Sequence, residues 1–263
     1  MPKVSALTTY PLKSAKGIAL NSLQLKNRGP KFDRDWMVIN ANNRFLSQRQ
    51  HPSMCLIGTT LSAGKLTLTA PNANPLTIDS QAAFNQQDVV VWSDNVSAID
   101  CGDQAAEWIS NFLGVECRIV HMPNETQRLV DKDYATQNET VSFADGFPSL
   151  IISQASLDDF NSKLERPISM AHFRPNIVID DCPPFAEDQW QAVRINGITF
   201  SLVKPCSRCI IPAIEPESGT KRMDVIKALS EHRRRGNATY FGQNALHDLE
   251  GEIQIGDNVE ILD

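Results

Sequence analysis

The stretch AVRINGITFSLVKPCSRC, residues 192–209, holds two β-like runs joined by a tight turn, and it ends in a close pair of cysteines. Ala192 to Ile195 and Thr199 to Val203 are rich in the apolar and β-branched residues that favour strands. Asn196-Gly197 between them is a strong signal for a two-residue hairpin turn. We therefore predict an antiparallel hairpin whose second strand is followed by the cysteine pair.

Short β-like runs also dominate the first hundred residues, and turn residues separate them. The runs are Val4 to Thr9, Leu20 to Leu25, Trp36 to Ile39, Leu56 to Leu61, Lys65 to Thr69 and Val89 to Trp92. Helical stretches do not alternate with these runs, so the pattern favours an antiparallel sheet or a barrel. Further strands are predicted over Cys117 to His121 and Asn176 to Ile179, and a closing strand pair over Gly251 to Leu262.

A few helices complete the pattern. Gln104 to Leu113 presents an apolar face, with Asp103 as its expected N-cap and Gly114 as its stop. Ser156 is the expected cap of a second helix, and a third is predicted over Met223 to Arg233.

The polar residues 122–145 are interpreted mainly as a connecting loop, with a functional flap as the alternative. The tryptophans at positions 36, 92, 108 and 190 are interpreted as core or barrel-rim residues. Together these patterns predict a mostly β protein with a few helices, of the α+β class.

Composition and charge exclude several classes of protein. The 263 residues are 41% hydrophobic and 21% charged, which is typical of a folded globular chain. The 25 Lys and Arg against 31 Asp and Glu give a net charge of −6, so binding to duplex nucleic acid is not expected. The sequence contains neither the run of about 20 apolar residues that a membrane helix needs nor a signal peptide. The six scattered cysteines favour a cytoplasmic protein with reduced thiols.

The sharpest chemical feature is Cys206-Ser207-Arg208-Cys209. Such a pair is ordinarily a redox disulfide, half of a zinc site, half of an iron–sulfur site, or two core thiols. Zinc needs two more ligands, usually a second close pair, and the sequence has no such pair and no ferredoxin spacing. Residues 210–212 are expected to be extended, which would not fit the helix of a thioredoxin motif. One thiolate acting as ligand or nucleophile, and two inert thiols, are the interpretations that stay open.

Four further motifs are weak when each is taken alone. The Arg of Phe173-Arg174-Pro175-Asn176 offers a planar fork that suits an anionic oxygen group. Lys13-Ser14-Ala15-Lys16-Gly17 and Asp33-Arg34-Asp35-Trp36 would ordinarily be solvated loop charges. The basic run His232-Arg233-Arg234-Arg235 fits a solvated helix end, with docking of an acidic electron donor as the alternative.

In combination these motifs resemble the MOSC-domain family, in particular its bacterial YcbX-like proteins and the mitochondrial amidoxime-reducing component. The matches span nearly the whole chain, in the order Tyr10 to Gly17, Asp33 to Ile39, Arg49-Gln50, Ser153 to Leu157, Phe173 to Val178, Cys206 to Cys209, Phe241 to Gln243 and Ile255 to Asp257. The resemblance implies a MOSC_N-type β-rich domain over residues 1–120 and a MOSC β-barrel over residues 121–263.

The resemblance also implies a molybdenum cofactor of the molybdopterin type, bound between the two domains. Cys209 matches the thiolate ligand of the metal and is the expected catalytic residue. The expected cofactor-binding residues are Lys13, Arg34, Gly146, Phe147, Arg174, Asn176, Ser207 and Arg208. Gly146 and Phe147 stand where the mitochondrial relatives have hydroxyl residues, so contact at these two positions is expected from the backbone. The resemblance raises pyridoxal phosphate binding as a further association of the family.

The function implied is a molybdenum-dependent reductase of N-hydroxylated compounds. Because the chain ends after its last predicted strand, without an iron–sulfur domain, electrons are expected from a separate ferredoxin- or flavoprotein-type partner. One alternative is a sulfur-carrier or cofactor-handling protein that uses Cys209 without turning over an organic substrate. A β-barrel whose pocket stays empty is the other.

Overall fold

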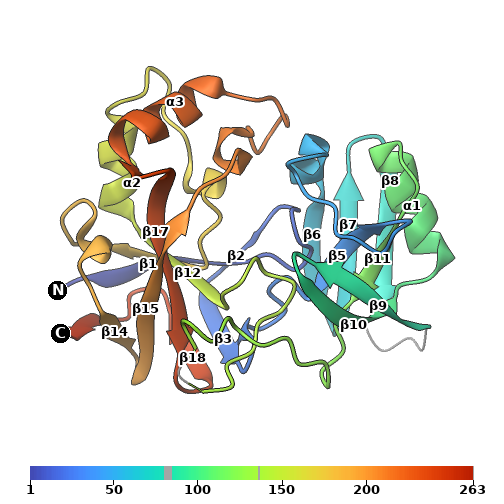
Figure 1. Ribbon diagram of the computed structural model, residues 1–263, viewed down its shortest axis with the longest axis horizontal. Helices are drawn as coiled ribbons and strands as arrows, with labels where there is room; N and C mark the ends of the chain where they lie inside the picture. The colour runs from blue at the N-terminus through green and yellow to red at the C-terminus, as the bar shows by residue number, and fades with distance from the viewer. Residues whose placement is uncertain (80–84, 136, 263) are drawn as a thin grey trace.

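The hairpin at Asn196-Gly197 forms as expected and lies within a large curved sheet. A computed structural model of the chain describes residues 1–79, 85–135 and 137–262. The elements gather into two bodies, a larger barrel-like one that contains both ends of the described chain and a smaller one with α1 (Asp103–Leu113) at its outer edge (Figure 1). The mostly β class with a few helices is confirmed.

The larger body is built on one mixed sheet with the strand order β19-β14-β15-β17-β12-β13-β1-β2, and β16 pairs with β17. Its strands are β1 (Lys3–Thr9), β2 (Ile18–Leu20), β12 (Ser149–Ser153), β13 (Ile177–Asp180), β14 (Ala192–Ile195), β15 (Ile198–Ser207), β16 (Arg234–Arg235), β17 (Ala238–His247) and β19 (Val259–Leu262). Backbone hydrogen bonds from Val4 to Asp257 and from Val259 to Pro2 bring β1 back beside β19, which closes the barrel.

One parallel strand pair interrupts this antiparallel barrel. The strands β12 and β13 run parallel and are joined by α2 (Gln154–Asn161). Ser153 caps α2, because its hydroxyl accepts from the backbone N–H of Ser156; the expectation that Ser156 is the cap was wrong. The Ser156 hydroxyl instead donates to the buried carboxylate of Glu187. The helix α3 (Met223–His232) begins where predicted, and α2 and α3 share an apolar cluster with β12 and β17.

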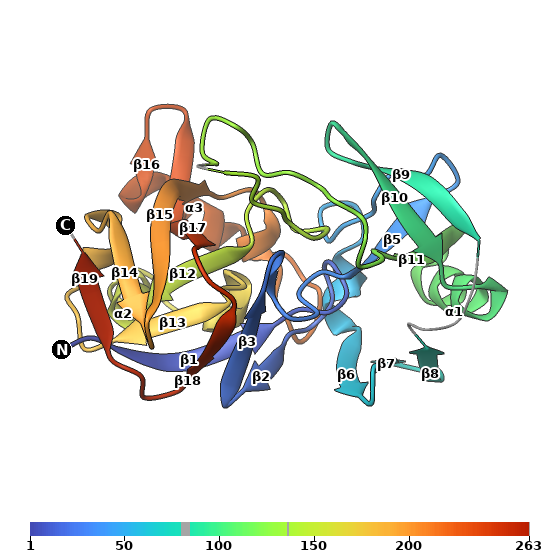
Figure 2. The same ribbon diagram turned by 90° about the horizontal axis from the view of Figure 1, so that it is seen from below.

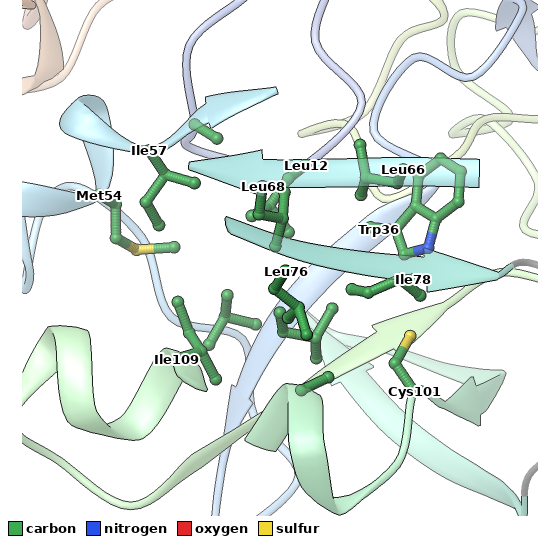
Figure 3. Close-up of a cluster of buried hydrophobic side chains, with 14 of the residues drawn as sticks. Leu12, Trp36, Met54, Ile57, Leu66, Leu68, Leu76, Ile78, Cys101 and Ile109 are labelled. Carbon is green, nitrogen blue, oxygen red and sulfur yellow. The ribbon is translucent and has the colours of Figure 1, made fainter. Parts of the chain in front are cut away.

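The smaller body holds two sheets and a helix. Its strands are β5 (Trp36–Asn40), β6 (Gly58–Ser62), β7 (Lys65–Ala70), β8 (Ala73–Asp79), β9 (Gln86–Val91), β10 (Asp94–Asp100) and β11 (Cys117–His121), and its helices are η1 (Pro52–Leu56) and α1 (Asp103–Leu113). Trp36, Met54 and Ile109 are among the buried side chains that fill the space between β7, β8 and α1 (Figure 3). Fully burying side chains of this size contributes roughly 1.5–3 kcal/mol each.

The helix α1 ends as predicted but begins differently. Gly114 adopts the left-handed conformation that closes a helix, with φ of +70°. The expected N-cap Asp103 is instead the first helical residue and follows Gly102. Its carboxylate accepts a hydrogen bond from Arg118, which explains why it does not turn back to cap the helix.

The predicted closing strand pair at the end of the chain was wrong. Two strands do form there, β18 (Gly251–Gln254) and β19, but they do not pair with each other. The strand β18 pairs with β3 (Ser22–Lys26), which also pairs with β4 (Gly29–Pro30), while β19 pairs with β14. The strands β4, β8, β10, β12, β16 and β17 were not predicted.

The strands β1 to β3 lie with the larger body although they precede the smaller one in sequence (Figure 2). The division of the sequence into two domains at residue 120 stays a prediction. Three segments run between the bodies: residues 10–17 reach the smaller body and return to the larger one, residues 31–36 lead to the smaller body, and residues 122–148 lead back. Within the described part of this last segment no named helix or strand occurs, as the loop interpretation expected. None of the helices in the described residues is long and apolar enough to span a membrane.

Candidate functional site

The three crossing segments meet at a cleft of about 700 Å³. Lys13 comes from the first crossing, Arg34 from the second, and Gly146 with Phe147 from the third. The barrel supplies Arg174 and Asn176 before β13, and Ser207 to Cys209 from the end of β15. All nine residues singled out in the sequence therefore line one cleft. Their roles toward a bound group stay predictions.

The Asn176 side chain makes four hydrogen bonds, and two of them join the barrel to the segment that leads to the smaller body. Its oxygen accepts from the Arg34 guanidinium at 3.2 Å and from the backbone N–H of Leu150 at 3.2 Å. Its nitrogen donates to the Asp33 carboxylate at 2.9 Å and to the Thr8 carbonyl at 3.2 Å. Because Asn176 is buried and fully engaged, it holds Arg34 in place and has no donor left for a ligand.

Two arginines enclose the buried ring of Tyr10. The guanidinium of Arg34 lies 4.4 Å from the ring centroid, and that of Arg174 lies 4.2 Å away. Arg34 is also ion-paired with Asp33, and Arg174 donates to the Ala15 carbonyl at 2.7 Å. Burial lowers the pKa of Arg174 to about 10, which leaves it protonated at neutral pH.

Both arginines sit on strained backbone. Arg34 has φ of +53° and Arg174 has φ of +57°, in the left-handed region that non-glycine residues seldom occupy. Such strain persists where surrounding contacts enforce it, and it is common at functional sites. The two positive φ values aim both guanidinium groups at the cleft and at the same ring.

A third cation, Lys13, is held by the carboxylate of Asp145. The Lys13 ammonium is 2.5 Å from one Asp145 oxygen and 2.7 Å from the Phe143 carbonyl, and Arg49 approaches the other Asp145 oxygen at 3.4 Å. Burial alone would raise the pKa of Asp145, but the charge and hydrogen bond of Lys13 hold it well below its usual range. Asp145 therefore stays ionised and fixes Lys13 on the cleft wall.

The two cysteines of the pair lie in different surroundings. Cys209 is exposed on the cleft, whereas Cys206 is half-buried against the apolar cluster beneath α2 and α3. Burial raises the pKa of the Cys206 thiol. The Arg208 guanidinium between them donates to the carbonyls of Phe241 and Phe173, so it braces this corner of the barrel. Of the two, Cys209 therefore offers the accessible thiol at the cleft, and elsewhere in the described chain Cys182 is half-buried.

Several lining residues carried no sequence signal strong enough to single them out. Among them are Ser149 and His172. Ser14, Arg49 and Lys204 stood within the quoted stretches of sequence but were not expected to bind the cofactor, and Trp92 was interpreted as a core or barrel-rim residue. The buried Ser149 hydroxyl, which lines the cleft, is without a hydrogen-bond partner among the described residues. At Gly146 an added Cβ would meet nothing within 4 Å, so this position does not need glycine for space.

The cleft is strongly cationic although the protein as a whole is acidic. Its charged lining comprises Lys13, Arg34, Arg49, Arg174, Lys204 and Arg208, and among the described lining residues the acidic one is Asp145. Fixed cations with little opposing charge attract an anionic ligand, most strongly where the walls exclude water. Among the described residues, no three His, Cys, Asp or Glu side chains gather into a metal site.

The fold and the site together define a class of protein. It is mostly β, its barrel meets a smaller β body at a cation-lined cleft, and an accessible thiol lies in that cleft. The MOSC N-terminal beta barrel domain matches residues 1–116, and the MOSC domain matches residues 138–260. The chain belongs to the MOSC family, which confirms the resemblance noted in the sequence.

Similar proteins extend over nearly the whole chain. Mitochondrial amidoxime-reducing component 1 from Mus musculus is 33% identical over 98% of this chain and 82% of its own length. Its counterpart from Homo sapiens is 31% identical with the same coverage. Mitochondrial amidoxime reducing component 2 from Homo sapiens is 30% identical over 97% of this chain and 82% of its own length.

We predict that Asn176→Ala lowers the free energy of unfolding by about 2–4 kcal/mol, because it leaves several buried partners unsatisfied and each costs about 1–3 kcal/mol. Asn244→Ala is the matched control. Asn244 also lines the cleft, but its side chain makes one hydrogen bond, to the Lys204 carbonyl at 3.2 Å. Urea denaturation measures both variants. Equal losses would contradict the joining role of Asn176.

Proposed function

We propose that this protein binds molybdenum cofactor in the cleft and reduces N-hydroxylated compounds, with electrons from a separate protein. The observation that carries the proposal is the exposed Cys209 thiol in a cleft lined by six cations from both bodies. The similarity to the amidoxime-reducing components supports the substrate class. Amidoximes, hydroxylamines and N-hydroxylated base analogues share the N–O bond that such an enzyme would break.

The residues present fit such a cofactor. A phosphate and an anionic dithiolene need fixed positive charge, which Arg174, Lys204 and Arg49 supply on different sides of the cleft. A thiolate is a soft ligand that suits a metal already bound by sulfur, and Cys209 offers the accessible one. The unpartnered Ser149 hydroxyl is a further polar group at the same wall.

The protein residues would bind and orient, while the cofactor would supply the two-electron chemistry of N–O cleavage. Cys209 would hold the metal. Arg174 would bind the anionic part of the cofactor, its guanidinium kept in place by Tyr10 and the Ala15 carbonyl. Lys13 would act as a fixed positive charge whose position Asp145 determines. Asn176 would hold the Arg34 guanidinium in position through a hydrogen bond, and Arg208 would hold the backbone at Phe241 in the same way.

We predict that Cys209→Ala loses N–O reduction by more than about 100-fold, since even groups that merely hydrogen-bond to metal ligands are worth about 10–100-fold. Cys206→Ala is the matched control and should keep most of the activity, because Cys206 packs against the apolar cluster. The measurement is consumption of an amidoxime by cofactor-loaded protein with a chemical reductant. Equal loss in both variants, or full activity without Cys209, would refute the assignment.

Thiol labelling adds a control that does not depend on turnover. In cofactor-free protein Cys209 should be alkylated first, because it is exposed while Cys55, Cys101 and Cys117 are buried. Loading with cofactor should protect Cys209. Protection without any amidoxime consumption would point to the sulfur-carrier or cofactor-handling alternative.

A second prediction concerns the source of electrons. The sequence carries neither a ferredoxin cysteine spacing nor a Gly-x-Gly-x-x-Gly fingerprint for a dinucleotide. We therefore expect no turnover with NADH alone, and turnover once a reductase and its small electron carrier are added. The assay follows NADH oxidation with an amidoxime, with and without the carrier proteins. Rapid turnover of the isolated chain with NADH would show that no separate donor is required.

A further inference from the structure

Trp92 occupies an unfavourable backbone position at the tip of the β9–β10 hairpin. Val91 pairs with Asp94, so Trp92 and Ser93 form a two-residue turn in which Trp92 has φ of +58°. Turns of this kind favour Gly or Asn where φ is positive, and the Asn196-Gly197 hairpin of this chain follows that preference. A bulky side chain in this region is an outlier. The geometry of the turn therefore does not explain why a tryptophan occupies this position, and the explanation must come from what its side chain contacts.

The Trp92 ring is exposed but its position is fixed. The Phe45 ring lies 5.1 Å from it, and the Arg49 guanidinium lies 4.8 Å from its centroid. Arg49 reaches Asp145, Asp145 holds Lys13, and the Lys13 ammonium lies 5.2 Å from the Phe45 ring. These five side chains form a closed ring of contacts. The indole is thereby held in a set place relative to the cationic wall of the cleft.

Trp92 differs from the other exposed apolar side chains in where it lies. In the described residues the large apolar side chains that are exposed are Met1, Trp92, Val115, Leu129, Met223, Leu249, Ile255 and Ile261. Of these, Trp92 lines the cleft, with 43% of its surface exposed. The cleft thus combines fixed cations with the exposed indole of Trp92, beside a second lining ring, Phe147, that is half-buried. A ligand that matches both has a polar reacting group attached to a planar ring.

We propose that Trp92 is a specificity-determining residue that contacts the ring of aromatic N-hydroxylated substrates and so favours them over short alkyl ones. The inference rests on the proposed reductase function. Trp92 lies in the cleft lining and is linked to the Lys13–Asp145 pair through Arg49 and Phe45. This placement favours contact with a small molecule over docking of an electron-donor protein. Stacking between aromatic rings requires the offset or edge-on approach that an exposed indole permits.

The test compares benzamidoxime with acetamidoxime on cofactor-loaded protein. Calorimetry gives the affinity for each, and turnover with a chemical reductant gives kcat and KM without any donor protein. Trp92→Ala should weaken affinity and raise KM for benzamidoxime about three- to tenfold, which is the range of one aromatic contact. Acetamidoxime should be unaffected. Trp92→Phe should keep most of the preference, because it retains a ring.

Trp92→Asn separates recognition from folding. Asn suits the positive φ, so this variant should be at least as thermally stable as the wild type while losing the preference for benzamidoxime. A lower Tm with an unchanged preference would identify Trp92 as a packing residue and overturn the proposal. An unchanged benzamidoxime affinity in Trp92→Ala would overturn it as well.

Two outcomes distinguish this inference from the proposed function. If loaded protein binds benzamidoxime in a Trp92-dependent way but reduces neither compound, the reductase proposal fails and the aromatic contact is supported. If both compounds are reduced and Trp92→Ala leaves their ratio unchanged, the reductase proposal stands and the inference fails. In the separate assay with NADH and the carrier proteins, a rise only in the KM for the donor protein would assign Trp92 to partner docking, which also overturns the inference.

Discussion

The cleft depends on one buried contact, the hydrogen bond between the Asn176 amide and the Asp33 carboxylate. Asn176 comes from the barrel, and Asp33 from the segment that crosses to the smaller body. The Asp33 carboxylate also accepts from the backbone N–H of Tyr10 and pairs with Arg34. One carboxylate and one amide thus fix the segment at Tyr10 and the segment at Arg34 against the barrel. Unsatisfied buried polar groups are costly, so this arrangement specifies a single geometry.

That geometry explains how a protein with a negative net charge maintains a positively charged cleft. The chain carries a net charge of −6, yet its cleft gathers cations that would repel one another in isolation. Asp33 and Asp145 offset two of them, and the Tyr10 ring accommodates two guanidinium groups at once. The remaining positive charge faces the cleft. An anionic ligand would therefore relieve repulsion that the fold itself maintains, which is a physical reason for tight binding.

Local sequence signals predicted much of the fold but not how its parts meet. The Asn196-Gly197 hairpin and the Gly114 helix stop are decided by neighbouring residues, and both form as expected. The pairing of β18 with β3 joins segments more than two hundred residues apart, and no local pattern encodes it. At the site, the resemblance to the MOSC family, with its motifs in sequence order, identified nine residues, and all nine line one cleft. Trp92 was interpreted as a core or barrel-rim residue, because a lone tryptophan beside a turn resembles any other, and only the assembled structure shows it exposed at the cleft.

The central claim is that cations from two bodies hold a molybdenum cofactor in this cleft. Elemental analysis of protein made in a host that synthesises the cofactor tests it most directly. Wild-type protein should contain stoichiometric molybdenum, and Arg174→Ala should lose most of it while remaining folded by circular dichroism. Arg194→Ala, which removes an exposed ion pair with Glu260 on β14 and β19, should keep it. Wild-type protein without molybdenum, or an Arg174→Ala variant with undiminished molybdenum, would contradict the account.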